Sequence, residues 1–424
     1  MHITIVALGS RGDVQPCVAL GMGLTQTGYQ VRIATYGAFA DLVGRYGLEF
    51  APVEGDPRQA MEAQSGQEWL NSGKNALKFM RGMRDLSTYE TLTKTLDDVV
   101  EACRGTDAVL YTVLGAAGYH VAERMNVPSL YLLLQPLSRS RETPSVLAPA
   151  VPLGGIYNWW THVFTEQLFW QMVRTPINRW RRESLKLKPI PLRGPFDLLY
   201  QKRMPFIYGF SPAVVPRARD WPDWHHITGY WFLDDRNDWS PPAGLVDFLA
   251  GGPKPIYIGF GSMSGPTAQR LADQAVEAAT LAKQRAILPG GWAQAHERDF
   301  PDHIFAIESA PHDWLFPRAS AVVHHGGAGT TAAGLRAGRP SVITPFFGDQ
   351  PYWGRRVHAL GVGPEPIMRK AMTAQRLAEA ITRSVIDEEM RRHAAELGER
   401  IRAEDGVGTA VTIITQHLAT NGVP

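Results

Sequence analysis

Cysteine is scarce in this sequence, and the two signs of charge nearly balance. The two cysteines, Cys17 and Cys103, provide neither a disulfide framework nor a cysteine-based metal site, and such usage is typical of a reducing cytosol. The formal net charge is +2, which excludes the strong positive field expected of a nucleic-acid-binding protein. Apolar residues make up 44% of the chain, which is enough for a full core. We therefore expect a globular, cytoplasmic protein with no nucleic-acid partner.

Long uninterrupted apolar runs are also missing. Residues 143–165 carry no formal charge and are long enough to cross a bilayer, but Pro144, Pro149 and Pro152 interrupt them. The apolar run at 3–8 lacks the basic start of a secretion signal and passes directly into a glycine. We expect neither a transmembrane helix nor a signal peptide, and residues 3–8 are typical of a first β-strand.

The length of the chain and the alternation of its elements predict two α/β domains. A chain of 424 residues exceeds one typical domain. Apolar strand runs alternate with amphipathic segments, which is typical of parallel, doubly wound (Rossmann-like) sheets. The expected strands are 3–8, 31–35, 108–112 and 129–133 in the first half and 256–260, 286–288, 322–325 and 341–344 in the second. Acidic, proline and glycine residues at 236–253 indicate a linker, so we predict domains at 1–235 and 254–405 and a closing amphipathic helix within 406–424.

The most specific pattern is a strand that runs into glycines and then into a short helix. The apolar run 321–323 is followed by His324-His325-Gly326-Gly327-Ala328-Gly329-Thr330-Thr331. Such a turn directs unpaired backbone N–H groups and the positive end of a helix dipole at one point, where the natural occupant is a phosphate. One histidine can reach the same anion, and Asp349-Gln350 adds a carboxylate and an amide suited to sugar hydroxyls. The block therefore predicts a seat for a sugar diphosphate.

Three further loops of the second half are candidates for holding the rest of a nucleotide. Ser262 follows a strand in Gly259-Phe260-Gly261-Ser262-Met263 and can donate to a phosphate, although a plain tight loop is the alternative. Trp292 follows Gly290-Gly291 and can stack on a base, although a tryptophan more often serves packing. The loop from Ala310 to His312 can read a base edge with its backbone groups.

A metal is not expected at these loops. Adjacent strand residues point to opposite faces, so only one of His324 and His325 faces the ligand, and no third ligand lies at a usual spacing. The sequence also lacks a D-x-D pair, which would hold a divalent ion in nucleotide-sugar chemistry. Protein dipoles would then stabilise a leaving diphosphate.

Asp13 is the candidate catalytic residue of the first half. It ends Gly9-Ser10-Arg11-Gly12-Asp13, where the first strand passes into the first helix at the edge where doubly wound sheets bind ligands. The loop is not the G-x-G-x-x-G dinucleotide motif, which disfavours a nicotinamide or flavin cofactor. Asp13 can act as general base on a hydroxyl, or it can cap the first helix, and the two roles are compatible.

Segment 157–188 is first aromatic and then basic, and we predict two helices there. It indicates a membrane-surface patch or a lid over an apolar acceptor, with an ordinary covering helix pair as the alternative. The aromatic residues proposed to contact an acceptor are Trp159, Trp160, Phe164 and Phe169. The basic residues that follow are Arg179, Arg181, Arg182, Lys186 and Lys188.

These motifs resemble those of the GT-B glycosyltransferases, which include bacterial and fungal sterol glucosyltransferases and antibiotic aglycone glycosyltransferases. The resemblance runs nearly end to end. It is carried by Gly9-Ser10-Arg11-Gly12-Asp13-Val14-Gln15-Pro16, Gly229-Tyr230-Trp231, Ile258-Gly259-Phe260-Gly261-Ser262-Met263, Pro311-His312-Asp313-Trp314-Leu315, the 324–331 block and Pro345-Phe346-Phe347-Gly348-Asp349-Gln350. The resemblance implies two Rossmann-like domains facing each other across a cleft, with the acceptor in the first and the donor in the second, and a final helix that crosses back to the first.

The resemblance also implies roles for individual residues in an inverting transfer from a nucleoside-diphosphate sugar to a hydroxyl. Asp13 would be the general base. The implied donor contacts are His325, Gly327, Gly329, Thr330 and Ser262 to the diphosphate, Trp292, Ala310 and His312 to the base, and Asp349 and Gln350 to the sugar.

Two positions depart from the plant relatives. Ala333 stands where these carry a ribose-binding Glu, so the choice between uridine and thymidine donors is open. Plant relatives use a histidine base held by an Asp after the fourth strand, whereas this chain has Asp13 and no such partner at Tyr111-Thr112. A carboxylate with a pKa near 4 is a weak base, which suffices if burial raises its pKa or if proton transfer is late.

We expect a metal-independent, monomeric glycosyltransferase that moves glucose from UDP-glucose to a sterol or similar lipid, with the nucleotide sugar as co-substrate and no further cofactor. Residues 157–188 can give it peripheral contact with the inner membrane face. The alternatives are an aglycone glycosyltransferase of antibiotic biosynthesis that uses a UDP- or dTDP-sugar, a non-catalytic nucleotide-sugar or lipid-binding protein, and a nucleotide-sugar epimerase.

Overall fold

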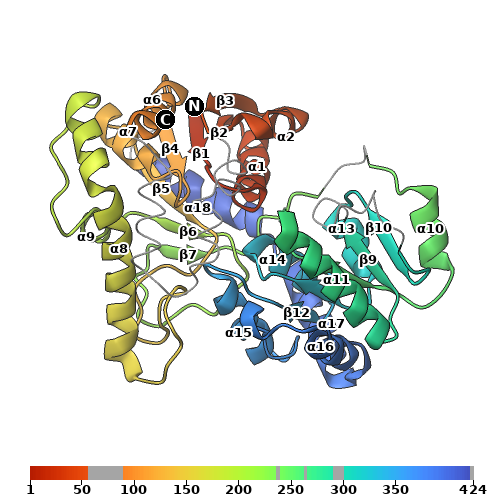
Figure 1. The fold of residues 1–424 in the computed structure, drawn as a ribbon. Coiled ribbons are helices and arrows are strands. Elements are labelled where there is room, and N and C mark those ends of the chain that lie inside the picture. Colours follow the sequence, from red (N-terminus) through yellow and green to blue (C-terminus); the bar gives the residue numbers. More distant parts are fainter. Residues whose placement is uncertain (56–88, 235–238, 262–264, 290–299, 421–424) are drawn as a thin grey trace. The chain divides into compact units, whose positions relative to one another are not determined.

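The chain folds into two compact units, shown as a ribbon in Figure 1. Unit 1 contains Met1–Leu233 together with Asp405–Pro424, and unit 2 contains Asp234–Glu404. This computed structural model describes residues 1–55, 89–234, 239–261, 265–289 and 300–420. Both units are α/β, with parallel sheets and helices packed on them, as the alternation of elements predicts.

The sheet of unit 1 has seven strands in the order β3-β2-β1-β4-β5-β6-β7, and all neighbours pair in parallel. The strands are β1 (His2–Val6), β2 (Gln30–Tyr36), β3 (Glu49–Val53), β4 (Ala108–Tyr111), β5 (Ser129–Leu133), β6 (Phe206–Tyr208) and β7 (His225–Ile227). Central strands such as β4 are buried at every residue, because helices cover both faces of a parallel sheet.

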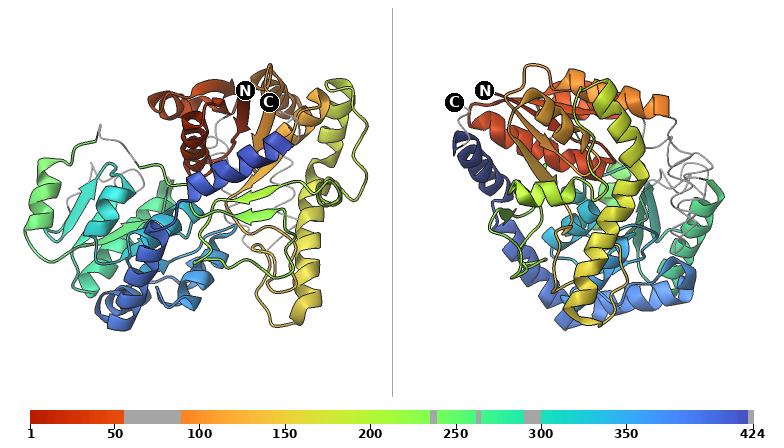
Figure 2. Two further views of the ribbon diagram at one scale, coloured as in Figure 1. Left: turned by 180° about the vertical axis from the view of Figure 1, so that it is seen from behind. Right: turned by 90° about the vertical axis from the view of Figure 1, so that its left-hand side faces the viewer.

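Helix α18 joins the core of unit 1 although it comes last in the sequence. Its Ala410, Val411 and Ile414 are buried in one cluster with α1, and Gly23 of α1 leaves no room for a side chain against Val407. Figure 2 allows α18, in blue, to be followed from behind. The helices of unit 1 are α1 (Arg11–Gln26), η1 (Gly37–Phe39), α2 (Ala40–Arg45), α6 (Tyr89–Ala102), α7 (Ala117–Met125), α8 (Gly154–Glu183), α9 (Phe196–Gln201) and α18 (Gly406–Thr420).

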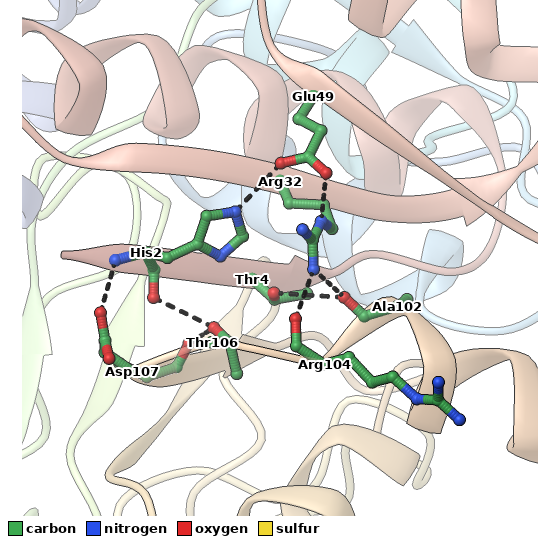
Figure 3. Close-up of polar contacts among 9 residues, drawn as sticks. His2, Thr4, Arg32, Glu49, Ala102, Arg104, Thr106 and Asp107 are labelled. Carbon is green, nitrogen blue, oxygen red and sulfur yellow. Dashed lines mark hydrogen bonds and ion pairs between the residues drawn. The ribbon is translucent and has the colours of Figure 1, made fainter.

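A polar cluster ties the amino ends of the unit 1 strands together (Figure 3). Glu49 of β3 accepts hydrogen bonds from Arg32 of β2 at 2.7 Å and from the ring of His2 of β1 at 3.0 Å. Arg32 also donates to the carbonyl of Ala102 at 2.8 Å, and Asp107 accepts from the backbone N–H of His2 at 2.7 Å. The strands are thus fixed at the edge opposite to the one where this class of sheet binds ligands.

Unit 2 contains a five-stranded parallel sheet in the order β10-β9-β8-β11-β12. Ile256 and Ile258 belong to one buried cluster and Tyr257 to another, so both faces of the sheet are covered. The strands are β8 (Ile256–Gly259), β9 (Ala286–Pro289), β10 (Ile304–Ile307), β11 (Val322–His324) and β12 (Ser341–Ile343). The helices are α10 (Ala243–Ala250), α11 (Gly265–Leu281), α13 (His312–Leu315), η3 (Phe316–Arg318), α14 (Ala328–Arg336), α15 (Gln350–Ala359), η4 (Arg369–Ala371), α16 (Ala374–Ile386) and α17 (Glu388–Arg402).

Two elements differ from the expectations drawn from the sequence. Residues 154–183 form the single helix α8, although two helices were predicted for 157–188. Pro176 removes one helical hydrogen bond, but Trp170 before it and Ile177 and Trp180 after it are all buried, and this packing continues the helix past the proline. Within the predicted linker, residues 243–250 form α10, whose Leu245 is completely buried in unit 2.

Candidate functional site

Each sheet has one point at which the order of its strands reverses, and the predicted loops lie at these points. In unit 1 the reversal lies between β1 and β4, and in unit 2 it lies between β8 and β11. Ligands of doubly wound folds bind at such points, outside the carboxyl ends of the strands. Asp13 follows β1, Gly261 follows β8 and His325 follows β11.

The glycine turn after β11 leads directly into helix α14. Gly326 has a φ of +88°, which lets the chain reverse without strain, and Gly327 is the N-cap. Thr331 donates its N–H to the Gly327 carbonyl at 2.9 Å, which closes the first turn of the helix. The N–H groups of residues 328–330 precede this bond and have no carbonyl partner within the helix. With the dipole of a nine-residue helix behind them, they form an anion-binding end.

The ring of His325 is held between two glycines at this helix end. A Cβ atom on Gly327 would lie 2.6 Å from His325 Nε2, and one on Gly261 would lie 3.1 Å from its Cε1. Either addition would push the imidazole out of place. Burial lowers the pKa of His325 to about 4, so the ring is neutral at pH 7. It can therefore offer a single N–H to an anion without carrying a charge itself.

His324 faces inward and supports the turn. Its side chain is fully buried, and its Nδ1 accepts the backbone N–H of Gly326 at 3.1 Å. This bond requires Nδ1 to be unprotonated, so the ring proton lies on Nε2. Burial, with smaller effects from His325 and His312, holds the pKa of His324 well below its usual range. His324 thus supports the turn from inside, and it stays a prediction that His325 is the histidine that faces a ligand.

The start of helix α15 is packed against the glycine turn. A Cβ atom on Gly326 would lie 3.1 Å from the carbonyl oxygen of Gln350. The side-chain oxygen of Gln350 accepts the backbone N–H groups of Phe346 at 2.8 Å and Phe347 at 3.2 Å, so Gln350 has its NH₂ group to offer a ligand. Asp349 is the N-cap of α15, and its Oδ2 accepts from Trp353 Nε1 at 2.8 Å. Of the two side chains predicted to bind sugar, Gln350 also fixes the local backbone, and Asp349 also binds the Trp353 indole.

The remaining donor-side candidates divide into two groups. The ring of His312 stacks on Phe316 with centroids 4.2 Å apart, and Ala310 packs against the same apolar cluster. Ala333, the position of the plant Glu, packs there too, so an apolar side chain suits this place. Ser262 and Trp292 lie outside the described residues.

Asp13 is held by the residue that begins helix α1. Both the backbone N–H and the hydroxyl of Ser10 donate to Asp13 Oδ2, each at 2.8 Å. Ser10 is the N-cap of α1 and Asp13 is the third helical residue, so Asp13 does not cap the helix directly but completes a capping box. Gly9 has a φ of +129°, and a Cβ atom there would lie 2.5 Å from Asp13 Oδ2. The second oxygen, Oδ1, takes part in neither of the Ser10 bonds.

The surroundings of Asp13 favour its protonated form. Desolvation by burial raises the pKa of Asp13, and the two hydrogen bonds from Ser10 offset part of this rise. Burial and the charge of Asp13 together raise the pKa of Tyr36, at the end of β2. After β4, where plant relatives carry an Asp, this chain has Thr112. The Thr112 hydroxyl accepts from the Gly115 N–H at 3.3 Å. Asp13 is therefore made more basic by burial.

The four aromatic residues proposed to contact an acceptor do not share a face of α8. Trp160 and Phe164 are 62% and 65% exposed on the outer face. Trp159 lies under the guanidinium groups of Arg139 and Arg141, which are 5.9 and 5.8 Å from its ring centroid. Phe169 is nine positions after Trp160, which is about two and a half turns, so it lies on the opposite side of the helix. Within α8 they cannot line one pocket together.

The described residues contain no group of three or more His, Cys, Asp or Glu side chains that could hold a metal ion. Among the helices that the structure describes, none is long and apolar enough to cross a membrane.

Two positioning residues were missed in the sequence, His324 and Ser10. Ser10-Arg11-Gly12-Asp13 has the spacing of a capping box, and this spacing was the available signal. No sequence pattern marks the bond from Gly326 to His324, because it depends on the dihedral angles of the turn.

Solved structures share this fold along nearly the whole chain. The glycosyltransferase of kitacinnamycin matches with a TM-score of 0.71 and 21% identity, over 98% of this chain and 99% of that one. SnogD from Streptomyces nogalater matches with a TM-score of 0.67 and 20% identity, over 98% and 100%. At such identities the likeness concerns the fold.

Sequence relatives and family models give the family. Residues 3–142 match the glycosyltransferase family 28 N-terminal domain, and residues 290–414 match the C-terminal domain of erythromycin biosynthesis protein CIII-like proteins. A sterol 3-beta-glucosyltransferase of Emericella nidulans is 40% identical over 99% of this chain, and one of Cryptococcus neoformans is 38% identical over 99%. The chain spans about 30% of the length of these fungal relatives. From these matches and the shared fold, the chain belongs to the glycosyltransferases of the GT-B fold.

Proposed function

We propose that the protein transfers glucose from UDP-glucose to the 3β-hydroxyl of a sterol, with inversion at the anomeric carbon and without a metal ion. The observation that carries the proposal is the clamped imidazole: His325 lies between Gly261 and Gly327 at the first turn of α14. Such an arrangement suits the diphosphate of a sugar nucleotide. The sterol acceptor is supported by the names of the fungal relatives, which match along 99% of this chain.

In the proposed reaction Asp13 is the general base. It takes the proton of the sterol hydroxyl as the oxygen attacks the anomeric carbon from the face opposite the diphosphate. The new C–O bond forms as the bond to the leaving phosphate oxygen breaks, which gives a β-glucoside and UDP from an α-linked donor. The N–H groups of residues 328–330 and the His325 ring take up the negative charge on the leaving group. Burial, which raises the pKa of Asp13, makes its carboxylate a stronger base.

A second candidate is an aglycone glycosyltransferase that uses a dTDP-sugar. It is favoured by the structure of VinC in complex with dTDP, which matches this chain with a TM-score of 0.65 at 18% identity. Ala333 supports neither donor, because it provides no ribose-binding carboxylate.

The test crosses UDP-glucose and dTDP-glucose with sterols and with polyketide aglycones, and identifies products by mass spectrometry and anomeric NMR coupling. We expect a steryl β-glucoside from UDP-glucose, formed equally well in excess EDTA. Asp13→Asn should retain UDP binding in calorimetry and lose about 10²–10⁴-fold in turnover. The exposed Asp41, in the first turn of α2, provides the control Asp41→Asn, which should leave turnover intact.

Three results would contradict the proposal. Glycosylation of aglycones alone would favour the second candidate. Tight UDP binding without any transfer would indicate a binding protein. Full activity of Asp13→Asn would remove Asp13 as the base.

A further inference from the structure

Helix α8 has its polarity reversed along its first half. Its inward-facing residues Asn158, His162 and Glu166 are polar, recur every fourth position and are all buried. Each has a fixed partner. Asn158 donates to the Arg141 carbonyl at 2.9 Å, the His162 ring lies 3.0 Å from the Thr143 carbonyl, and Glu166 is paired with Arg139. The polar side chains on the inner side of α8 are thus all bonded to other residues of unit 1.

The outer side of the same half-helix is apolar. Ile156, Trp160 and Phe164 follow each other at four-residue spacing and are 62–70% exposed. The loop before α8 adds further exposed apolar side chains, so that the α8 apolar surface consists of Leu147, Val151, Leu153, Ile156, Trp160 and Phe164. An exposed patch of this kind marks a contact site, since ordinary surface helices place such residues inward.

The charges around the α8 apolar surface indicate what covers it. No residue from 143 to 165 is formally charged, and the exposed Arg141 and Glu142 lie just before this stretch, where Glu142 is paired with Arg219 at 3.6 Å. Beyond the patch α8 carries Arg174 and Arg182, the first of them ten residues after Phe164, which is about 15 Å along the helix. Arg179 between them is paired with Glu183 at 2.9 Å. Aromatic and aliphatic side chains flanked by arginines match a bilayer interface, where the apolar groups enter the acyl boundary and the cations meet anionic headgroups.

We propose that the α8 apolar surface docks unit 1 on the face of a lipid bilayer that carries anionic headgroups. Trp160, Phe164 and Ile156 enter the headgroup boundary, and Arg174 and Arg182 of α8 lie over the lipid phosphates. The relevance of this contact to turnover rests on the proposed function, because a sterol acceptor resides in the bilayer. The docking itself needs no donor, acceptor or turnover.

The primary experiment measures partitioning of the full chain onto vesicles by co-sedimentation. Neutral phosphatidylcholine vesicles are compared with vesicles that also contain phosphatidylglycerol. We expect binding to both, stronger with the anionic lipid, and a loss of this difference at high salt. The variant Leu153→Ser/Ile156→Ser should lower the partition coefficient about tenfold or more, since it removes two inserted side chains. Serine is also a favoured N-cap at position 153, so the helix should remain intact.

The matched control is Leu281→Ser/Ile386→Ser, which removes two exposed apolar side chains of unit 2 that are 48% and 66% exposed. It should bind vesicles like the wild type. Wild-type protein that remains in the supernatant with both vesicles would refute docking. Equal losses in the two variants, or a patch that instead forms a dimer in light scattering, would refute it too.

A second measurement separates docking from the acceptor site. Sterol is supplied either in vesicles or on cyclodextrin, and glucoside formation is followed. Leu153→Ser/Ile156→Ser should slow only the vesicle reaction, and a loss with cyclodextrin as well would assign the patch to acceptor binding. If no sterol is glucosylated but vesicle binding remains patch-dependent, the proposed function fails while the docking surface stands.

Discussion

At the scale of single residues, the basicity of Asp13 is set by two opposing influences within a few ångströms. Removal from water raises its pKa, while the Ser10 N–H and hydroxyl stabilise the carboxylate and lower it. Substitution of Ser10 by alanine removes the hydrogen bond from the hydroxyl and keeps the one from the backbone N–H. Ser10 therefore serves both as N-cap of α1 and as a regulator of the proposed base.

Ser10→Ala should shift the pH dependence of turnover. Without the hydroxyl bond the pKa of Asp13 rises further, so the carboxylate is lost at a higher pH and the acid limb of the kcat/KM profile moves to higher pH. Ser10→Thr keeps a hydroxyl and should keep the wild-type limb. The alanine variant should also lose about 0.5–2 kcal/mol of unfolding free energy through the missing cap. An unchanged acid limb would mean that Asp13 does not set it.

His324 is expected to position the diphosphate turn through its Nδ1 atom. His324→Asn places an oxygen where Nδ1 was and should keep UDP affinity within about threefold, whereas His324→Leu has no acceptor and should lose about three- to tenfold. His324→Gln carries its acceptor one bond farther out and should resemble Leu. Isothermal calorimetry with UDP provides the comparison. Equal UDP affinities of the His324→Asn and His324→Leu variants would show that His324 contributes only packing and not a hydrogen bond to the turn.

Much of the site geometry could be predicted at this scale, and the rest depended on three-dimensional detail. Asp13, Gly261 and His325 could be placed at the carboxyl edges of the parallel sheets because glycines directly after apolar strands mark that edge. The inward-facing oxygen of Gln350 could not be predicted, because it follows from the fold of 345–350 around its own side chain.

At the scale of elements, α8 is attached to unit 1 by a buried ion pair. Arg139 donates to Glu166 at 2.5 and 2.9 Å and to Asp197 of α9 at 2.7 Å. Burial raises the pKa of Glu166, and the Arg139 hydrogen bonds and charge lower it in part. Removal of Arg139 would leave a carboxylate with little solvent and no cation.

Arg139→Met should lower the unfolding free energy by about 3–5 kcal/mol at pH 7. The deficit should shrink on acidification, because a buried Glu166 whose pKa is raised takes up a proton and no longer needs a partner. Arg139→Met/Glu166→Met should recover much of the loss. The exposed pair Arg179–Glu183 provides the control, and Arg179→Met should cost less than about 1 kcal/mol. Urea titrations at pH 5 and pH 7 give these values, and a pH-independent deficit would contradict the assignment to Glu166.

The elements themselves were predicted best where hydrophobic period and flanking glycines agree. Strand β5 matches its predicted range of 129–133, because four consecutive residues, 130–133, are buried together after Ser129. Helix α8 was split in the prediction because the composition of 157–188 changes from aromatic to basic. The helix continues because side chains on both sides of Pro176 are buried. That burial depends on residues that are distant in the sequence, so the local pattern could not predict it.

At the scale of the whole molecule, unit 1 is assembled from two separate parts of the chain. Residues 405–420 pack on α1 after the chain has passed through all of unit 2. Ile414 and Ala410 are fully buried within the unit 1 core. The stability of unit 1 therefore depends on side chains that follow unit 2 in the sequence.

Ile414→Ala should destabilise unit 1 selectively, by about 2–5 kcal/mol, through the lost burial and the cavity it leaves. Hydrogen exchange followed by mass spectrometry should accelerate in β1, β2 and α1, while β8 to β12 keep their protection. Ile386→Ala, at a site 66% exposed in unit 2, should change neither unit. Equal acceleration in both units would show that they unfold as one.

The late position of α18 also sets an order of events on the ribosome. Unit 2 is contiguous from Asp234 to Glu404, so its last residue leaves the exit tunnel before the residues that complete unit 1. The part of α1 that packs on Val407 and Val411 therefore stays uncovered until residues 405–420 have been synthesised, which is after all of unit 2. Although most of unit 1 precedes unit 2 in the chain, unit 1 can therefore reach its native state only after unit 2 has been synthesised, and until then its α1 surface is one that chaperones would need to shield.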